Sequence, residues 1–165
     1  MPNWIANKLY IIGPAQDIAE FKAKSRDLYF PTKEERAGNH QPVKKRSKPV
    51  VVDLSFDRMV PVPLAVKKKP YIKLGNNCFE DPIIPWCRKH WGCKWDAYYP
   101  ELVRESKRRL FYCFSTPWDP PFEWLRRVSK QFPQLRFSLH YWDDSYDRWA
   151  LVRALKGHLK FKKTS

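Results

Sequence analysis

Strand patterns and proline-started helices follow one another in an order that few folds accommodate. Residues 7–13, NKLYIIG, form a β-rich run that ends at Gly13-Pro14. Apolar residues then recur at helical spacing, which predicts a helix over 14–26. Residues 50–57, VVVDLSFD, alternate between apolar and polar side chains and predict a half-buried strand. The first half of the chain is therefore predicted to run strand, helix, strand.

The second half repeats this order. Residues 97–117 predict a hairpin whose second arm is apolar on both faces. Asp119 precedes two prolines, which predicts a helix over 120–132 with Asp119 as its N-cap. Residues 135–142 alternate again, with the odd-numbered side chains facing the core. Strand, helix, strand twice over is the order of a ferredoxin-like α+β sandwich, in which an antiparallel sheet carries two long helices on one face.

The remaining segments complete the expected organisation. Residues 59–70 hold too many prolines for a central strand and form a connector, and a short inserted helix is predicted at 80–91. We expect a single ferredoxin-like domain over 1–149, with a mobile basic loop at about 31–49. A basic C-terminal extension over 150–165 is expected to follow it.

The net charge of the chain narrows the choice of partners. The 32 Lys and Arg residues against 17 Asp and Glu residues give +15. Such a charge attracts polyanions such as nucleic acid, or acidic membranes and proteins. The apolar runs are shorter than the roughly 18 residues of a membrane span, and the N-terminus lacks the order of a signal peptide. We therefore expect a cytoplasmic protein without membrane association, whose four cysteines are reduced.

The basic residues occur in several runs with few acidic neighbours. A single run in a balanced protein is usually a solvated surface, but repeated runs in a chain of this charge favour polyanion binding. The loops and the tail are therefore predicted to contact DNA, RNA or a host nucleoprotein complex. The predicted contact residues are Lys44, Lys45, Arg46, Lys48, Lys67, Lys68, Lys69, Arg104, Lys107, Arg108, Arg109, Arg126, Arg127, Lys130, Arg153, Lys156, Lys160, Lys162 and Lys163.

Residues 86–100, WCRKHWGCKWDAYYP, fit three kinds of structure. Cys78, Cys87, His90 and Cys93 supply a Cys3His set, but structural zinc sites usually bring two close pairs from separate knuckles, so we expect no metal. Trp, Tyr and Arg side chains are also those on which single-stranded nucleic acids stack. The same large aromatic side chains are more often buried in a core.

Four stretches of the chain, taken in order, resemble the YubB-like (Api-type) ferredoxin-fold family of phage and plasmid proteins. They cover residues 1–21, 54–63, 86–100 and 111–142, and include an Asn-Trp before the first strand, a Pro-rich connector and a Trp-Gly-x-Lys-Trp-Asp box. The resemblance implies a ferredoxin-like fold and an origin in a mobile element. It implies no chemistry, because the family has no established activity.

The resemblance also assigns structural roles. It implies that the tryptophans of the family motifs pack in the core, that the glycine of the box ends the 80–91 helix in a left-handed conformation, and that this helix covers the sheet face left open by the two long helices. One departure is Cys93, which stands where the family has threonine. The residues of this structural set are Trp4, Trp91, Gly92, Trp95, Asp96 and Trp118.

Catalytic signatures are missing from the sequence. It has no Walker loop, dinucleotide fingerprint, zinc-protease motif or nucleophile elbow. Asp143, Asp144 and Asp147 offer carboxylates for Mg²⁺, but an acidic surface turn is the more common use of such a cluster. We therefore expect no enzyme and no cofactor.

Two functions stay open. The first is a phage or plasmid accessory protein that binds nucleic acid or a nucleoprotein; the second is an interaction protein that modulates a host factor, such as a nucleic-acid-targeting defence complex (anti-CRISPR-like), a polymerase or the ribosome. Residues 9–13, LYIIG, resemble the shorter aromatic signature of RNA-recognition motifs. The longer partner signature is missing because residues 108–115, RRLFYCFS, lack its glycine, so we interpret 9–13 as a strand that happens to contain a tyrosine.

Overall fold

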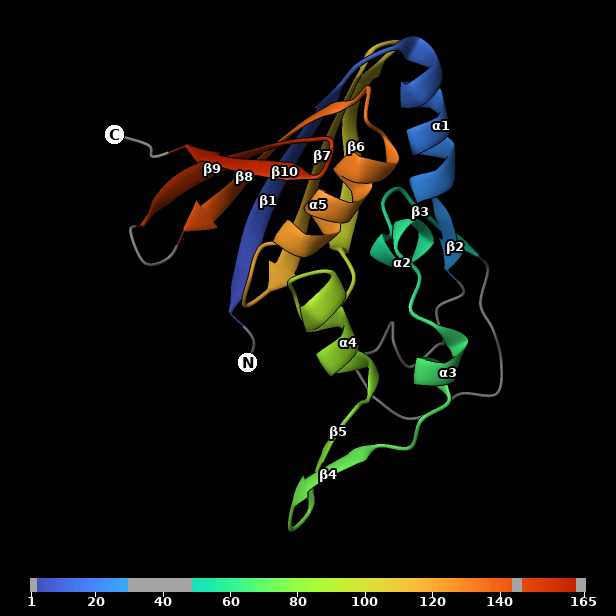
Figure 1. Cartoon of the computed structure of the whole chain (residues 1–165), viewed down its shortest axis with the longest axis vertical. Coiled ribbons are helices and arrows are strands. Elements are labelled where there is room, and N and C mark those ends of the chain that lie inside the picture. The colour runs from blue at the N-terminus through green and yellow to red at the C-terminus, as the bar shows by residue number, and fades with distance from the viewer. Residues whose placement is uncertain (1–2, 30–48, 144–146, 163–165) are drawn as a thin grey trace.

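The computed structural model describes residues 3–29, 49–143 and 147–162. These residues form an antiparallel sheet with helices on one face, and two short ribbons beside it (Figure 1). The strands are β1 (Trp4–Ile12), β2 (Asp27–Tyr29), β3 (Val50–Val52), β4 (Ile72–Gly75), β5 (Cys78–Glu80), β6 (Tyr98–Ser106), β7 (Arg109–Pro117), β8 (Arg136–Asp143), β9 (Arg148–Leu155) and β10 (His158–Lys162). The helices are α1 (Ala15–Ser25), α2 (Phe56–Met59), α3 (Leu64–Lys67), α4 (Ile83–His90) and α5 (Phe122–Gln131).

The main sheet has the strand order β10-β9-β8-β1-β7-β6, and every neighbouring pair in it is antiparallel. Its inner part, β8-β1-β7-β6, together with α1 and α5 gives the βαββαβ arrangement of a ferredoxin-like sandwich. Both long helices lie against the same face of the sheet (Figure 1). The predicted fold class is confirmed.

The core lies between the sheet and these helices. Alternate side chains of a strand point to opposite faces, so every second residue of the central strands faces α1 and α5. From the helices, Phe21 on α1 and Trp124 on α5 are completely buried. The strand residues packed against them are Leu9, Ile11, Leu110, Tyr112, Phe114, Phe137 and Leu139.

Most of the locally predicted elements are present. The hairpin over 97–117 is β6–β7, the strand over 135–142 is β8, and the predicted helices correspond to α1, α4 and α5. The N-cap assignment is wrong: Pro121 holds that position in α5 and makes no side-chain capping bond. Asp119 instead uses its backbone carbonyl, which accepts a hydrogen bond from Thr116 Oγ1 at 2.8 Å.

The strand predicted over 50–57 is wrong beyond its first three residues. Residues Val50–Val52 form β3, which pairs with β2 in a separate two-stranded ribbon and is not a strand of the main sheet. The rest of the segment enters helix α2, whose N-cap is Ser55. The Ser55 hydroxyl accepts from the Arg58 amide at 3.3 Å, and this local bond competes with an extended conformation.

The expected C-terminal extension is also different in the structure. Over the described residues it forms β9 and β10, which widen the sheet beyond β8. Val152 and Ala154 are buried, and Lys156 and Gly157 make the turn with positive φ angles of 51° and 82°. The loop expected at about 31–49 falls almost entirely on residues 30–48, which lie outside the described part of the chain.

The expectation that the 80–91 helix covers the second face of the sheet is wrong for α4. This helix packs beside α5, because Cys87, Trp91 and Cys93 belong to the same buried cluster as Trp124. The amide of Trp124 donates to the Trp91 carbonyl at 3.0 Å. The left-handed conformation predicted for Gly92 is present, with φ of 87°.

Two further features complete the architecture. The β4–β5 hairpin projects away from the sheet and helices (Figure 1). Among the described residues, no helix combines the length and the apolar character needed to cross a membrane.

Candidate functional site

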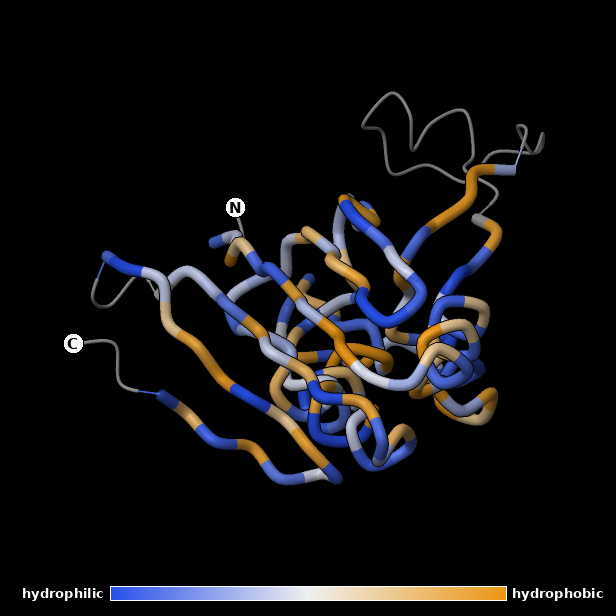
Figure 2. The backbone as a smooth tube through the Cα atoms, turned by 90° about the horizontal axis from the view of Figure 1, so that it is seen from above, coloured by the Kyte–Doolittle hydropathy of each residue, from blue (hydrophilic) through white to orange (hydrophobic). Residues whose placement is uncertain are grey.

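The sheet face opposite α1 and α5 is uncovered in the described part of the chain. Its residues are the even-numbered positions of β1 and β8 and the odd-numbered positions of β7 and β9, as the pairing register requires. Tyr10 and Ile12 on β1 are 37% and 46% exposed although they stand in the middle of the sheet. The alternation of hydrophilic and hydrophobic residues is visible along β10 near the C-terminus (Figure 2). We call this surface the open face.

Basic side chains dominate the open face. The β1–β7 register places Arg109 beside Ile12, and the β8–β9 register places Arg153 beside Ser138. Among the described strand residues on this face, one is acidic, Glu101, which pairs with Cys113. The basic residues are Lys8, Arg104, Arg109, Arg136, Arg153, Lys160 and Lys162.

An aromatic group occupies the centre of this face. The rings of Tyr10 on β1 and Phe111 on β7 stack with centroids 4.3 Å apart and planes 6° from parallel. His140 on β8 meets Tyr10 edge-on at 5.4 Å. These three rings come from three adjacent strands, so the sheet register alone brings them together.

Two more aromatic groups lie nearer the edges of the open face. Trp4 stacks on Tyr98 of β6 with centroids 4.6 Å apart and an angle of 22°. Trp142 and Trp149 meet edge-on at 5.7 Å, and the Lys8 Nζ lies 4.2 Å from the centroid of Trp149. Aromatic groups therefore lie on both sides of the central rings, and one of them is in contact with an ammonium group.

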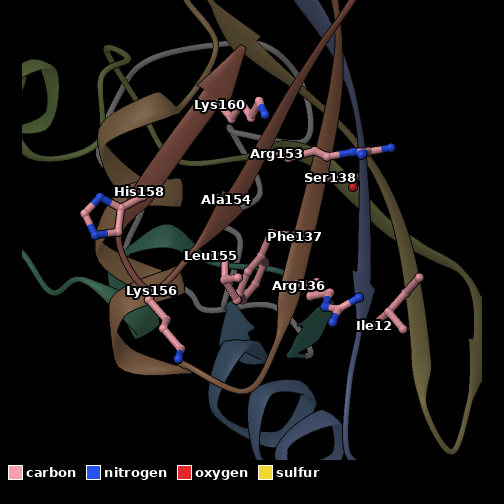
Figure 3. Close-up of a pocket in the computed structure, with 10 residues that line it drawn as sticks. All are labelled: Ile12, Arg136, Phe137, Ser138, Arg153, Ala154, Leu155, Lys156, His158 and Lys160. Atoms are coloured by element: carbon pink, nitrogen blue, oxygen red, sulfur yellow. The ribbon is translucent and has the colours of Figure 1, made fainter. Parts of the chain in front are cut away.

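Two hollows lie on the open face, on either side of Ile12. One has a volume of about 590 Å³ and is lined by Arg136, Arg153 and Lys160 among others (Figure 3). The second, of about 460 Å³, is lined by Tyr10, Phe111, Arg104 and Arg109 among others. We call the second hollow the Phe111 groove. Each hollow combines guanidinium groups with apolar surface.

His140 reports on the electrostatics of this surface. Partial burial, together with repulsion from Lys8 and Arg153, lowers the pKa of His140 below its ordinary value. The unfolded chain therefore takes up this proton at a higher pH than the folded chain does, so acidification below the ordinary histidine pKa destabilises the fold. An NMR titration of the His140 ring should give a pKa below 6.5.

The His140→Gln variant should lose part of this acid sensitivity in unfolding experiments at several pH values. His90, whose pKa is also lowered, mainly by burial, needs the parallel His90→Gln variant as a control. An ordinary pKa for His140 would contradict the combined effect of burial and of the charges of Lys8 and Arg153 described here.

The structure separates the basic residues predicted from the sequence into distinct places. Arg104, Arg109, Arg153, Lys160 and Lys162 share the open face. Others occupy tight turns or the opposite layer, and Lys67 is engaged by Asp57 at 2.7 Å. In the turns are Lys107, Arg108 and Lys156, on α3 and just after it are Lys67, Lys68 and Lys69, on α5 are Arg126, Arg127 and Lys130, and outside the described residues are Lys44, Lys45, Arg46, Lys48 and Lys163.

The residues of the structural set, which the family resemblance assigned to packing, differ in their burial. Trp91 is 3% exposed, and its Nε1 donates to the Val60 carbonyl at 2.9 Å, so the packing role predicted for it is present. For Trp4, Trp95 and Trp118 this prediction is wrong, since they are 38%, 42% and 52% exposed. They lie at strand ends and in loops that no described element covers.

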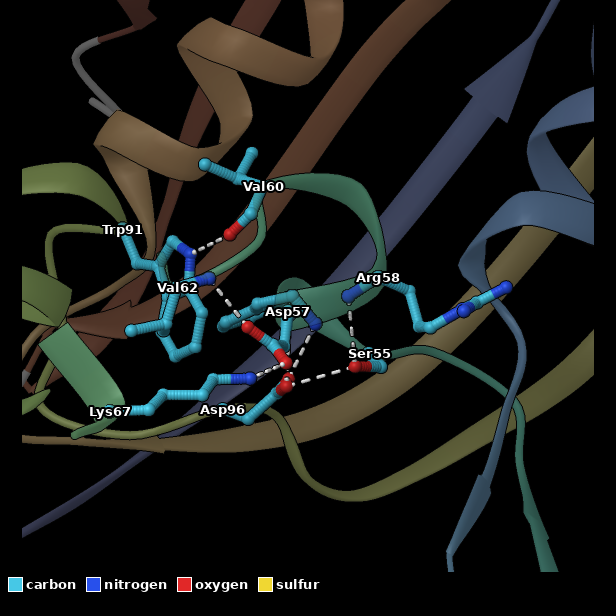
Figure 4. A network of polar contacts seen from close by, with 9 residues as sticks. Ser55, Asp57, Arg58, Val60, Val62, Lys67, Trp91 and Asp96 are labelled. Carbon is cyan, nitrogen blue, oxygen red and sulfur yellow. Dashed lines mark hydrogen bonds and ion pairs between the residues drawn. The ribbon is translucent and has the colours of Figure 1, made fainter. Parts of the chain in front are cut away.

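Asp96, the last residue of the box, organises the start of α2 (Figure 4). Its carboxylate accepts hydrogen bonds from the amides of Phe56 at 2.5 Å, Asp57 at 3.0 Å and Ala97 at 2.7 Å, and from the Ser55 hydroxyl at 3.0 Å. Burial raises the pKa of Asp96, and these bonds oppose the rise. The role of Asp96 is therefore to hold the chain that crosses from β3 to α2.

The Cys3His set considered from the sequence is not assembled in the described part of the chain. Cys87 and Cys93 are buried in the core while Cys78 is exposed, and burial raises the pKa of the Cys87 thiol to about 12. Among the described residues, no three His, Cys, Asp or Glu side chains gather as a metal site. Of the acidic turn, Asp144 lies outside the described residues and Asp147 is an exposed residue with φ of 48°.

Several residues of the open face were missed by the sequence reasoning. The sequence interpretation gives Tyr10 no role beyond its place in a strand, and it places Phe111 in a hairpin arm that is apolar on both faces. The outward positions of β8, Arg136, His140 and Trp142, follow from the alternation that predicted its inward residues. The usable signal was therefore strand alternation in neighbouring strands, combined with the strand order of the ferredoxin-like fold.

Comparison with known proteins agrees with this architecture. Residues 89–148, from the end of α4 to the start of β9, match the family model described as the ferredoxin-like domain in Api92-like protein. No curated protein matches the chain. The crystal structure of the protein Api92 from Yersinia pseudotuberculosis superposes with a TM-score of 0.65 at 9% sequence identity, and covers 100% of this chain and 99% of that one. At this identity the likeness shows the fold alone, so the resemblance to the Api-type ferredoxin-fold family is confirmed by the shared fold and by the family match of residues 89–148.

Proposed function

We propose that this protein binds nucleic acid through the open face of its six-stranded sheet. The observation that carries the proposal is the imbalance of charge on a surface that no described element covers: seven Lys and Arg residues, Lys8, Arg104, Arg109, Arg136, Arg153, Lys160 and Lys162, against Glu101. Phosphates neutralised by such residues release their counterions, and this release drives binding.

The basic residues are available to a ligand. Within the described residues, ion pairs join Lys22 to Glu105, Lys67 to Asp57, Arg88 to Glu80 and Arg126 to Glu123. None of these pairs uses a cation of the open face. Arginine, which supplies four of the seven cations, also binds phosphate in a bidentate manner. The proposed interface therefore lies mainly on the open face of the sheet, and the loops and the tail do not form it by themselves.

On this basis we propose that the protein is a non-catalytic accessory protein of a phage or plasmid, which acts in the cytoplasm and needs no cofactor. The Api-type resemblance supports the origin in a mobile element, and the charge supports contact with DNA, RNA or a nucleoprotein.

The salt dependence of binding tests this proposal. Arg109, Arg136 and Arg153 are replaced together by Gln, and affinity for labelled single-stranded DNA, duplex DNA and RNA is measured by fluorescence anisotropy across a range of salt. The log–log slope should become less steep by about 0.7 per lost contact on a single strand, and by about 0.9 on a duplex. Weaker binding at every salt concentration should accompany this change.

The matched control replaces Lys24, Arg26 and Lys89 by Gln, which removes the same charge from exposed positions on α1, its C-cap and α4. Its slope should stay close to that of the wild-type chain. Equal loss in both triple variants would mean that net charge, and not the open face, governs binding. Absence of salt-dependent binding to any nucleic acid would overturn the proposal.

A protein partner is the second candidate function, and the β4–β5 hairpin favours it. Ile72, Leu74 and Phe79 on this projecting ribbon are 41%, 60% and 59% exposed. A two-stranded hairpin has little stability by itself, and clustered exposed apolar residues mark interaction surfaces. The partner would be a host factor such as a defence complex, a polymerase or the ribosome.

Affinity purification from nuclease-treated host lysate tests this second candidate. The wild-type chain should retain a stoichiometric protein that the Leu74→Ser, Phe79→Ser double variant does not retain. Recovery of the same proteins by both chains would remove the support that the hairpin gives.

A further inference from the structure

We infer that the ligand of the open face is a single strand, whose unpaired bases stack at two separate places along β1. This inference rests on the proposed nucleic-acid binding and adds the form and length of the nucleic acid. The first place is the central station, formed by Tyr10 and Phe111, and the second is the terminal station, formed by Trp4 and Tyr98. Both belong to the open face because Trp4 and Tyr10 are even-numbered residues of β1.

The central station has the shape and chemistry to hold a base. Tyr10, Phe111, Arg104 and Arg109 line the Phe111 groove, together with Glu105, whose carboxylate is paired with Lys22. Unpaired bases are held in proteins by stacking on aromatic rings and on the planes of arginine guanidinium groups. A base-paired duplex presents its phosphates to such a surface and keeps its base faces stacked inside, so this groove selects a single strand.

The terminal station repeats the same chemistry at the other end of β1. Trp4 and Tyr98 stack at 4.6 Å, and both are substantially exposed, at 38% and 45%. Trp95 lies 6.4 Å from Trp4, and the Lys94 Nζ lies 4.6 Å above the ring of Trp95. Such an exposed cluster at the edge of a positively charged surface matches the aromatic surfaces on which bases stack.

The distance between the stations sets the length of the ligand. Trp4 and Tyr10 are six residues apart on one strand, which corresponds to about 20 Å at the rise of an extended chain. A stacked single strand advances by 3.4 Å per nucleotide and an unstacked one by more, so the span corresponds to roughly three to six nucleotides. Lys8 lies between the stations on β1, with its Nζ 4.2 Å from the centroid of the Trp149 ring, and adds positive charge along the path of the connecting backbone.

Binding of oligonucleotides of increasing length tests the inference. Labelled oligo(dT) and oligo(U) of roughly two to twelve nucleotides, and a duplex of mixed sequence, are titrated against the whole protein by anisotropy. Affinity for the single strands should rise steeply once the length reaches the span between the stations. The duplex should bind more weakly than a single strand of the same length.

Two double variants separate the stations. Tyr10→Ala with Phe111→Ala should weaken binding at every length, by about tenfold or more. Trp4→Ala with Tyr98→Ala should leave short oligonucleotides unaffected and abolish the rise at longer lengths. Tyr71→Ala, which removes a 66% exposed ring outside the sheet, is the matched control and should bind like the wild-type chain.

Each outcome decides between the alternatives. Oligonucleotide binding without a rise at longer lengths, or with equal affinity for the duplex, would overturn the inference and leave the proposed function intact. Equal competition by polyglutamate of similar charge would show a surface for acidic proteins and would also overturn it. No binding of any nucleic acid would remove both. Where an Ala variant does not fold, Tyr10→Leu or Trp4→Leu replaces it. Ultraviolet crosslinking of the bound strand, followed by mass spectrometry, then identifies the residues in contact with the bases. Crosslinks outside both stations would contradict the inference.

Discussion

Replacing Trp91 by Ala is expected to lower the free energy of unfolding by about 3–5 kcal/mol. Trp91 is 3% exposed, meets Phe56 edge-on at 5.8 Å and donates its Nε1 hydrogen to the Val60 carbonyl. The substitution therefore opens a cavity at the junction of α2, α4 and α5 and leaves a buried carbonyl without its donor. Urea unfolding followed by circular dichroism measures the change.

Trp95, four residues further along, supplies the matched control. It is 42% exposed and contacts Trp4 and Lys94 on the surface, so Trp95→Ala should cost less than about 1 kcal/mol. Similar losses for the two tryptophans would contradict the different roles assigned to them here. Trp91→Phe should fall between the two, since it keeps an apolar ring and loses the hydrogen bond.

Replacing Asp96 by Ala is expected to lower the free energy of unfolding by about 2–4 kcal/mol, because buried donors lose their acceptor. The amides of Phe56, Asp57 and Ala97 and the Ser55 hydroxyl all donate to this carboxylate. Asp96→Asn keeps one acceptor oxygen and should lose less. Thermal and urea unfolding of the three chains at neutral pH measure this order.

The control for this prediction is Asp17→Ala, which removes a partly exposed carboxylate from the first turn of α1. It should cost no more than about 0.5–1 kcal/mol. An Asp96→Ala variant as stable as this control would mean that water replaces the carboxylate in the capping arrangement.

The pH dependence of unfolding gives a second measurement at Asp96. Burial raises the pKa of Asp96 above its ordinary value, so the folded chain holds this proton more tightly than the unfolded chain does. The contribution of Asp96 to stability therefore decreases as the pH rises from the ordinary carboxyl pKa through the raised one. Asp96→Asn should remove this part of the pH dependence, and an unchanged profile would contradict it.

Local sequence patterns were sufficient for most of the sheet and its helices. Alternation and helical spacing are properties of consecutive residues, so they identified the segments that became β8, α1 and α5. The segment 50–57 has the same alternation, and there the prediction failed. Its conformation depends on Asp96, about forty residues further along the chain, which local patterns cannot register.

The candidate site was less accessible from the sequence. Basic runs predicted polyanion binding, but Arg126 and Arg153, both counted in them, lie on opposite sides of the sheet. The aromatic pair Tyr10 and Phe111 is separated by about a hundred residues and is formed only by the antiparallel register of β1 and β7.

By itself the sequence determined the fold class, the order of the main elements and the excess of positive charge, because each depends on composition or on neighbouring residues. The tertiary structure alone decided that α4 packs beside α5 and that the second face of the sheet is open in the described residues. It also decided which tryptophan of the WGCKWD box is buried and which is exposed. These features depend on contacts between segments distant in sequence, and strand register and helix packing fix such contacts only when the whole chain folds.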